Sequence, residues 1–526
     1  MNQTGDTILL VTQGGNLVGV VSLKDMLRFL SLKVELEEYP PLYTLVNKII
    51  DKRVEYTSPV DGTLWLFEVK EKKMKIEWKN LALLTDLYEL TMAASYYQHK
   101  MFAPATFSLF IRQYPPNRGY FVSAGLEEVL NFLESFHVSQ EDLDYLRTTR
   151  LFADDFLHYL GGVRFTGDLY AIPEGHLFFK DEPILEITAP IIEAQIIETY
   201  VINAINLQVI MATKAARCFH AAKGVLLVDF SFRRTQGIDA SLKVARASYL
   251  AGFSGTSNVL AGKLYGIPIS GTMAHSFITS FRDEIEAFRA FAETFPQTTV
   301  LLIDTYDTIA GAHKAVTVAK EMLRKGRKLK GVRLDSGDMA KLSLEVRKIL
   351  DGAGLEDVQI FASGGFDEYK IAQILQDGAR IDAFGVGTKV GVSADGPYAD
   401  IAYKLVKYDD RPVLKLSTGK RTLVDAKQVF RIYEKGKLAK GIIALRDEKL
   451  EGEPQLKLVM QNGNRLLPSE PLSELRNRFQ REFSTLDDKY KALENPELFP
   501  VELGPKLEQL QKQIIHKIRE KELGES

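Results

Sequence analysis

Short apolar runs that end in polar residues recur between residues 226 and 388. The runs have strand length, and most are separated by stretches of helical period, such as residues 283–295 and 339–354. Parallel strands that are buried on both faces read as continuous apolar runs, so this pattern predicts repeated β–α units. When such units close into a barrel, functional residues collect at the carboxyl ends of the strands. We therefore expect an irregular α/β barrel over residues 201–395, with a site at that end.

The segments on either side of these units have a different pattern. Residues 81–200 mix helical stretches with short alternating strands, whereas residues 396–465 contain strands joined by basic turns. We expect these two segments to form one α+β domain that the barrel interrupts. Residues 466–526 are charged and have helical period, which predicts a helical tail.

The sequence pattern of residues 1–80 is unlike that of the rest of the chain, and we expect these residues to form an N-terminal extension. Residues 8–33 read as a strand, a turn at Gly14 and Gly15, a second strand and a helix that begins near Ser22. This order, with the sequence LVGVVSLKDML, resembles the second half of a CBS module. Half a module is too little for an adenosine-ligand site, so the sequence assigns no function to the extension.

Composition excludes several classes of function. The chain has 67 basic and 69 acidic residues, and it lacks the basic excess of proteins that bind nucleic acid or anionic membranes. No apolar stretch reaches the roughly 20 residues of a membrane-spanning helix, and the N-terminus lacks the pattern of a signal peptide. The single cysteine, Cys218, allows no internal disulfide and is typical of a reducing compartment. We expect a cytoplasmic protein.

Side chains able to bind or attack an anionic ligand follow two of the runs. Arg233 and Arg234 come after LLVDF, and a guanidinium group can bind a carboxylate or phosphate through two parallel hydrogen bonds. We prefer Arg233, since an adjacent arginine pair can include one structural ion pair. His275 follows a turn of small residues that leaves room for an anionic ligand. A histidine serves as a general base or as a nucleophile toward phosphorus.

A carboxylate and two glycine-rich turns complete the predicted site. Asp335 ends the run GVRLD beside small residues, where a carboxylate suits ribose hydroxyls or a magnesium ion. Glycine-rich turns from strand to helix offer main-chain N–H groups to phosphate, and the late loops of a barrel often do so. The turn residues of the last two runs are Ser363, Gly364, Gly365, Gly387 and Thr388. The set as a whole predicts a phosphorylated sugar substrate.

Longer motifs at these positions resemble those of the nicotinate phosphoribosyltransferases. TDLYELTM, FSFRRTQG, GTMAHSF, GVRLDSGD, ASGGFDE and FGVGTKV follow the order and spacing of that family, and the resemblance covers about residues 81–520. It implies the barrel and α+β domain of the type II phosphoribosyltransferases. It also implies that nicotinate and phosphoribosyl pyrophosphate react, with ATP hydrolysis, to give nicotinate mononucleotide and pyrophosphate in NAD salvage. Magnesium, a hard cation, would be bound mainly through the pyrophosphate.

The resemblance also implies roles for individual residues. His275 matches the histidine that ATP transiently phosphorylates. Asp304 matches a carboxylate near that histidine, and a carboxylate in this place can orient an imidazole ring. Arg333 and Asp335 match groups that contact the base and the ribose hydroxyls.

The base and phosphate subsites are implied in the same way. Phe230 and Arg233 match the residues that stack on the pyridine ring and bind it. Tyr88 matches a tyrosine that reaches across a dimer interface to cover the ring, which implies a homodimer. The remaining matches form the cradle of the 5′-phosphate, and they are Gly364, Gly365, Gly387 and Thr388.

Ser257 bears on the choice of base. Relatives that use nicotinamide carry an aspartate at this position, where a carboxylate accepts a hydrogen bond from the amide. The same carboxylate would repel nicotinate, whereas serine is neutral and can donate. Nicotinate is therefore the expected base. Two alternatives stay open: a related enzyme that uses nicotinamide or another pyridine acid, and a nucleotide-sensing regulator with a silent barrel.

Overall fold

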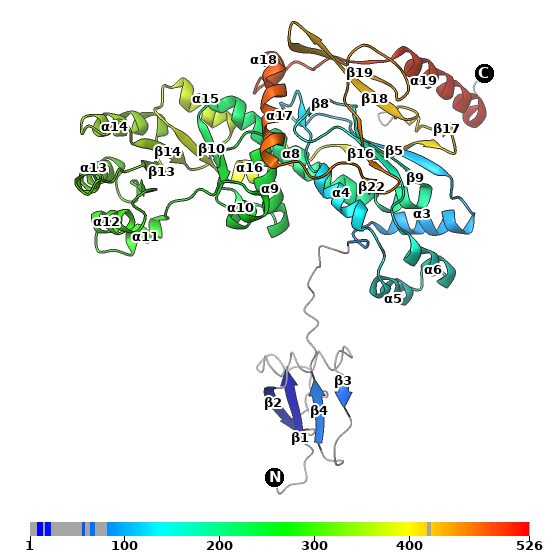
Figure 1. Ribbon diagram of the computed structural model, residues 1–526, viewed down its shortest axis with the longest axis horizontal. Coiled ribbons are helices and arrows are strands. Elements are labelled where there is room, and N and C mark those ends of the chain that lie inside the picture. Colours follow the sequence, from blue (N-terminus) through cyan, green and yellow to red (C-terminus); the bar gives the residue numbers. More distant parts are fainter. Residues whose placement is uncertain are drawn as a thin grey trace. The chain divides into compact units, whose positions relative to one another are not determined.

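The computed structural model describes residues 8–13, 16–22, 55–57, 64–68, 81–417 and 422–524 (Figure 1). The chain divides into two compact units, Met1–Trp78 and Lys79–Ser526. No helix in these described ranges is long and apolar enough to cross a membrane.

The first unit contains a four-stranded sheet of order β2-β1-β4-β3. Strands β1 and β2 pair antiparallel, as the strand–turn–strand pattern of the sequence predicts, and β1 also pairs parallel with β4. The helix predicted from near Ser22 falls outside the described residues, so the resemblance to half a CBS module stays a prediction. The strands are β1 (Ile8–Gln13), β2 (Asn16–Ser22), β3 (Glu55–Thr57) and β4 (Leu64–Glu68).

The second unit contains a seven-stranded antiparallel sheet built from three separate segments of the chain. Its order is β17-β16-β5-β9-β7-β21-β22, so the inner strand β5 lies between β9 and β16, a strand nearly 300 residues later in the sequence. Apolar side chains of β5 and β9 are buried in the core of this layer. The strands are β5 (Pro104–Ile111), β7 (Asp168–Ala171), β9 (Pro183–Pro190), β16 (Ile401–Tyr408), β17 (Arg411–Pro412), β21 (Lys457–Gln461) and β22 (Asn464–Arg465).

Helices pack on this sheet and connect it to the next layer. A box of reciprocal hydrogen bonds between Ser139 and Asp142 caps α5, which is the local signal that starts this helix. The long helix α8 packs on α4 and β16 and also on two helices of the parallel sheet, α9 and α15, and so joins the layers (Figure 1). The helices of the first layer are α3 (Leu87–Gln98), α4 (Leu126–Ser135), α5 (Gln140–Thr149), α6 (Asp154–Gly162), α7 (Ile191–Ile196) and α8 (Glu198–Ala222). Strands β6 (Phe121–Val122) and β8 (Leu177–Phe178) form a small pair beside them.

A six-stranded sheet follows, and every pair of neighbouring strands in it is parallel. This confirms the repeated β–α units predicted from the apolar runs. The order is β11-β10-β15-β14-β13-β12. The strands are β10 (Leu226–Asp229), β11 (Gly255–Thr256), β12 (Val300–Leu302), β13 (Gly331–Leu334), β14 (Gln359–Ser363) and β15 (Ala383–Val386).

The hydrogen-bond ladder of this sheet does not close into a ring within the residues that the structure describes. Strand β12 forms one edge, and at the other edge β11 continues only as a single parallel bridge between Thr256 and Ile269. Strand β11 has only two residues, and the next extended segment meets it at one point, so the ladder ends at this edge. The helices around the sheet are α9 (Ile238–Leu250), α10 (Val259–Tyr265), α11 (His275–Thr279), α12 (Glu284–Thr294), α13 (Thr308–Arg324), α14 (Met339–Asp351), α15 (Glu368–Gln376) and α16 (Thr388–Gly391).

The C-terminal part adds a four-stranded sheet of order β20-β18-β19-β23 and three α-helices, the last of which continues as a π-helical segment, Arg519–Leu523. The predicted helical tail is interrupted by β23, which pairs parallel with β19 because the chain returns to the edge of this sheet. The elements are β18 (Lys427–Glu434), β19 (Lys437–Leu445), β20 (Glu453–Pro454), β23 (Val501–Leu503), α17 (Leu472–Thr485), α18 (Asp488–Lys491) and α19 (Pro505–Ile518).

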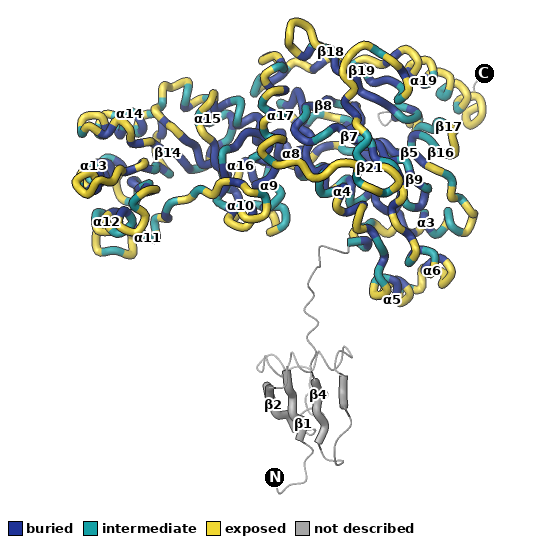
Figure 2. The backbone as a smooth tube through the Cα atoms, in the orientation of Figure 1, coloured by how far each residue is buried: buried dark blue, intermediate teal, exposed yellow. Residues whose placement is uncertain are grey.

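Two large apolar cores hold the second unit together. One surrounds the parallel sheet, and the other fills the antiparallel layer. In Figure 2 the buried backbone runs through both regions, and the exposed backbone is concentrated in the outer helices and turns. The carboxyl ends of the parallel strands are therefore carried on a rigid base.

Candidate active site

The register of the parallel sheet brings most predicted site residues to one edge. Asp229 at the end of β10 pairs with Thr256 and Val386, and Ser363 at the end of β14 pairs with Gly385. Since the strands are parallel, the residues that follow these positions emerge at the same edge. Residues placed there by their strands are Phe230, Ser257, Asp335, Gly364 and Gly387.

Asp335 lies at the centre of the contacts at this edge. One of its carboxylate oxygens accepts hydrogen bonds from the Ser363 hydroxyl and from Nη2 of Arg333, the latter at 3.4 Å. Its main-chain N–H donates to Oδ2 of Asp304 at 2.9 Å, and the Ser336 hydroxyl donates to the same oxygen at 2.6 Å. Four residues predicted from the sequence as parts of the site thus form one connected cluster.

Arg333 links this cluster to the loop that precedes His275. Its Nη1 donates to Oγ1 of Thr272 at 2.7 Å and to the carbonyl oxygen of Met273 at 2.9 Å. Burial lowers the pKa of Arg333, against the opposing effect of Asp335 and Asp304, and the charge of Arg233 lowers it further. Arg233 and Arg333 therefore both contribute positive charge at this edge, which makes it attractive to an anion.

His275 is the first residue of α11, and its side chain is 43% exposed. Nδ1 of the ring lies 3.1 Å from the Thr305 hydroxyl, and Nε2 lies 3.9 Å from Oδ2 of Asp335. Asp304 was expected to orient this ring, but its Oδ2 accepts from the main chain of Asp335 and from Ser336 instead. The carboxylate is held there because it satisfies a main-chain N–H group at the end of β13. Thr305, which the sequence analysis missed, contacts the imidazole in its place.

An aromatic pair forms one wall at the end of β10. The ring of Phe230 stacks on Phe361, with centroids 5.7 Å apart. A side chain at Gly385 would meet the Phe230 ring at 2.6 Å, so the glycine allows the ring to lie over β15. Ser257 is near this wall, and its main-chain N–H donates to the carbonyl oxygen of Asp229, the residue before Phe230, at 2.8 Å.

Asp229 itself is a buried acid that the sequence analysis did not single out. Its carboxylate accepts from the main-chain N–H of Ser231 at 2.9 Å and from the Thr256 hydroxyl at 2.7 Å. Burial raises the pKa of Asp229, and these hydrogen bonds oppose the rise. Asp229 is the only charged residue in the apolar run LLVDF, and this position could have identified it from the sequence as a buried acid. The residue ties the ends of β10 and β11 together beneath the site.

The two glycine-rich turns are held by charged residues behind them. Gly364 and Gly365 have φ angles of +111° and +68°, and Lys370 donates from Nζ to the carbonyl oxygen of Gly364 at 2.9 Å. Asp367 caps α15 and also accepts from Nζ of Lys389 at 2.9 Å. Lys389 belongs to α16, which Gly387 and Thr388 begin. The ion pair therefore connects the two turns.

Tyr88, which the sequence predicts as a site residue, does not lie at this edge within the same chain. It lies on α3 of the antiparallel layer, on the right of Figure 1, whereas strands β13 and β14 lie on the left. Its side chain is 46% exposed. Burial of the hydroxyl and the nearby Glu198 raise the pKa of Tyr88.

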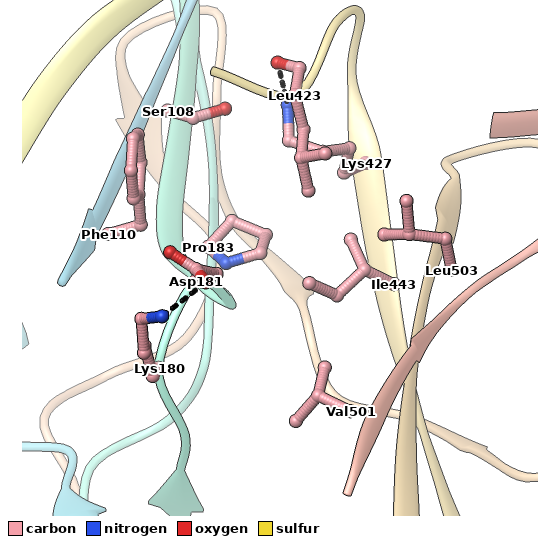
Figure 3. Close-up of a pocket in the computed structure, with 10 residues that line it drawn as sticks. All are labelled: Ser108, Phe110, Lys180, Asp181, Pro183, Leu423, Lys427, Ile443, Val501 and Leu503. Carbon is pink, nitrogen blue, oxygen red and sulfur yellow. Dashed lines mark hydrogen bonds and ion pairs between the residues drawn. The ribbon is translucent and has the colours of Figure 1, made fainter. Parts of the chain in front are cut away.

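The cavity in Figure 3 lies away from the carboxyl edge of the parallel sheet. It is between the antiparallel layer and the C-terminal sheet, with Phe110 and Pro183 on one side and Ile443 and Val501 on the other. The charged pair of Lys180 and Asp181 stands at its wall. None of the site residues predicted from the sequence lines this cavity.

Comparison with known proteins matches most of the second unit. Sequence models of the nicotinate phosphoribosyltransferases match at three places: the N-terminal domain at residues 83–206, the family's main model at residues 225–426 and the C-terminal domain at residues 450–511. A nicotinate phosphoribosyltransferase of Mycobacterium tuberculosis is 48% identical over 415 residues, covering 79% of this chain and 89% of that protein. One of Bacillus subtilis is 38% identical over 484 residues, covering 85% and 98%.

Solved structures give the same result. The crystal structure of human nicotinic acid phosphoribosyltransferase superposes with a TM-score of 0.74 at 28% identity, covering 82% of this chain and 99% of that one. A nicotinate-nucleotide pyrophosphorylase from Pyrococcus furiosus gives a TM-score of 0.65 at 26% identity, covering 79% and 98%. The layers described above are therefore shared with enzymes of known structure.

Proposed function

The chain belongs to the nicotinate phosphoribosyltransferase family, and we propose that it transfers a phosphoribosyl group from phosphoribosyl pyrophosphate to nicotinate in NAD salvage. The products are nicotinate mononucleotide and pyrophosphate. The observation that carries the proposal is the cluster of Arg333, Asp335, Asp304 and Ser363, with His275 beside it, at the carboxyl edge of the parallel sheet.

The residues at this edge suit the charges of that reaction. Displacement at the anomeric carbon builds positive charge on the ribose while pyrophosphate leaves with negative charge. A fixed carboxylate at Asp335 stabilises the first, and the guanidinium groups of Arg233 and Arg333 stabilise the second. The Gly364–Gly365 turn and the turn at Gly387 and Thr388 supply main-chain N–H groups to the 5′-phosphate.

The nicotinate base is proposed to bind at the aromatic wall formed by Phe230 and Phe361. We propose that Phe230 stacks on the pyridine ring and that Arg233, an exposed residue three positions later, binds the carboxylate of nicotinate. Ser257 leaves this subsite without a second negative charge, which favours nicotinate over nicotinamide.

Tyr88 completes the base subsite only from a second chain, and we propose a homodimer for this reason. The exposed residues beside it on the same segment include Leu84 and Leu87, at 48% and 55%. Neighbouring exposed apolar side chains of this kind favour burial against a partner surface.

We further propose that ATP hydrolysis is coupled to the transfer through phosphorylation of His275. The imidazole is half-exposed at the site edge, so a phosphate donor can reach it. Magnesium, when bound, neutralises charge on pyrophosphate. Asp304 and Asp335 are the oxygen donors that this chain offers beside it, and Oδ1 of Asp304 is buried with no hydrogen-bond partner in the described structure, which suits a hard cation.

A turnover assay tests these proposals. Purified protein is given phosphoribosyl pyrophosphate, magnesium and either nicotinate or nicotinamide, with and without ATP. We expect nicotinate mononucleotide from nicotinate, faster with ATP, and we expect His275→Ala to abolish the ATP stimulation and keep slow basal activity. Product from nicotinamide alone would support the nicotinamide-using relative. No turnover with either base, together with nucleotide binding that needs residues 1–80, would support the regulator.

A further inference from the structure

The imidazole of His275 is oriented by a residue that the motif comparison did not assign. We infer that Thr305 is the positioning residue that fixes this ring, with Nδ1 engaged and Nε2 left free to accept a phosphoryl group. The inference rests on the proposed phosphorylation of His275. It begins from the distance of 3.1 Å between Nδ1 and the Thr305 hydroxyl.

Two separate contacts hold the main chain and the ring. Arg333 binds the carbonyl oxygen of Met273 and the hydroxyl of Thr272, which fixes the loop that carries His275. These contacts do not reach the imidazole, and rotation about the bond to a histidine ring is broad when nothing else restricts it. The side chain is 43% exposed, so packing leaves much of the ring uncovered. The Thr305 hydroxyl therefore selects the ring orientation.

The neighbouring carboxylates, of Asp304 and Asp335, do not orient the His275 ring through a hydrogen bond. No hydrogen bond joins Asp304 to the imidazole: its Oδ2 accepts from Asp335 and Ser336, and its Oδ1 is buried without a partner in the described structure. Oδ2 of Asp335 lies 3.9 Å from Nε2, beyond hydrogen-bond distance. A carboxylate at that distance stabilises a positive ring electrostatically without occupying the nitrogen.

This arrangement determines which nitrogen reacts. With Nδ1–H donating to Thr305, the lone pair is on Nε2. That lone pair forms a bond to the γ-phosphorus of ATP, the bond from this phosphorus to the β,γ-bridging oxygen breaks, and ADP leaves with the electron pair. The proton stays on Nδ1, where the Thr305 oxygen accepts it in a hydrogen bond, and the Asp335 carboxylate near Nε2 stabilises the positive charge of the ring. The inferred product carries its phosphoryl group on Nε2.

The test compares two substitutions at one position. Thr305→Val keeps the shape of the side chain and removes the hydroxyl, whereas Thr305→Ser keeps the hydroxyl. Thr317→Val is the matched control, because Thr317 lies on the exposed face of α13 and its hydroxyl bonds only within that helix. Each full-length protein is mixed with magnesium and radiolabelled ATP. The initial rate of phosphohistidine formation is measured, and phosphorus NMR of the denatured protein at alkaline pH identifies the nitrogen.

We expect wild type, Thr305→Ser and Thr317→Val to form the Nε2 isomer at similar rates. We expect Thr305→Val to be slower by roughly tenfold, the effect of one hydrogen bond to a charged group, and to give both isomers. A normal rate and a single Nε2 isomer in Thr305→Val, or a Thr305→Ser protein that behaves as the valine variant, would overturn the role of Thr305 alone. Absence of phosphohistidine in the wild type would overturn the ATP coupling as well, while nicotinate turnover would still test the transferase activity.

Discussion

Replacement of Gly364 by alanine tests whether the turn after β14 fixes the position of Asp335. The φ angle of Gly364 is +111°, a conformation that side-chain-bearing residues rarely adopt. A Cβ atom there would lie 2.1 Å from the carbonyl oxygen of Asp335, so the two main-chain segments must move apart. The left-handed conformation costs about 1–2 kcal/mol, and forced repacking adds about 1–3 kcal/mol.

Gly365→Ala is the matched control because it changes the next residue in the same turn. Its φ angle of +68° is also left-handed, but a Cβ atom there would meet nothing within 4 Å. This variant should therefore lose only the conformational part, about 1–2 kcal/mol. The difference between the two variants isolates the contact with Asp335.

Two measurements check this prediction. Displacement of a site residue by about 1 Å can cost about 100-fold in rate, so kcat/KM for phosphoribosyl pyrophosphate should fall about 100-fold in Gly364→Ala. Gly365→Ala should lose less than about tenfold, since its strain of 1–2 kcal/mol is not directed at the cluster. Thermal unfolding should give Gly364→Ala the lower Tm. If the two variants have equal kcat/KM values and equal Tm values, the proposed link between this turn and Asp335 is wrong.

Two further predictions concern charge. Burial raises the pKa of Glu89 on α3 from its ordinary value of 4.5 to about 7, so between these values the folded protein binds more protons and its stability falls as pH rises. Glutamine stays neutral, so Glu89→Gln should avoid about 1–3 kcal/mol of this loss of folding stability. Its Tm should therefore exceed that of the wild type at pH 8 but not at pH 5. If the Tm values of the two proteins change in parallel with pH, the prediction is wrong. Ser257→Asp should lower the ratio of kcat/KM for nicotinate to that for nicotinamide by about 10–100-fold, as expected for one repulsive contact of about 1.4–2.8 kcal/mol. Ser257→Ala, which adds no charge, should leave that ratio nearly unchanged, and equal ratios in all three proteins would show that this position does not select the base.

The sequence predicted well where the strands of the parallel sheet end. The runs before Asp335, Ser363 and Gly387 are apolar because both faces of a parallel sheet are buried, and this leaves few places where polar side chains can emerge. The order of the runs also predicted parallel pairing. Closure of the sheet was not predictable in the same way, because it depends on hydrogen bonds at the edges, where β11 is only two residues long.

Contacts between side chains of different strands were harder to predict. Asp304 follows β12 as expected, but a carboxylate at a strand end can turn toward either neighbour, and the free N–H group of Asp335 decided its direction. Nothing in the sequence marked Thr305 as a site residue, because threonines often follow strands without any functional role. Glu89 is buried within a helix whose pattern gave no reason to bury an acid. Of its partners, Thr85 lies just before this helix, but Thr199 comes from α8, more than 100 residues later.

The strand order of the antiparallel layer constrains how the newly made chain can fold. During synthesis β5 and β9 appear early and can pair at once, but β16, the other neighbour of β5, begins only at residue 401. All six parallel strands and α8 have been made by then, so that sheet can assemble while one edge of β5 still has free N–H and C=O groups. Contacts of such large sequence separation form slowly. The antiparallel layer is therefore completed only after the strands of the parallel sheet have been made, and a chain that stops before residue 401 carries an open strand edge that invites aggregation.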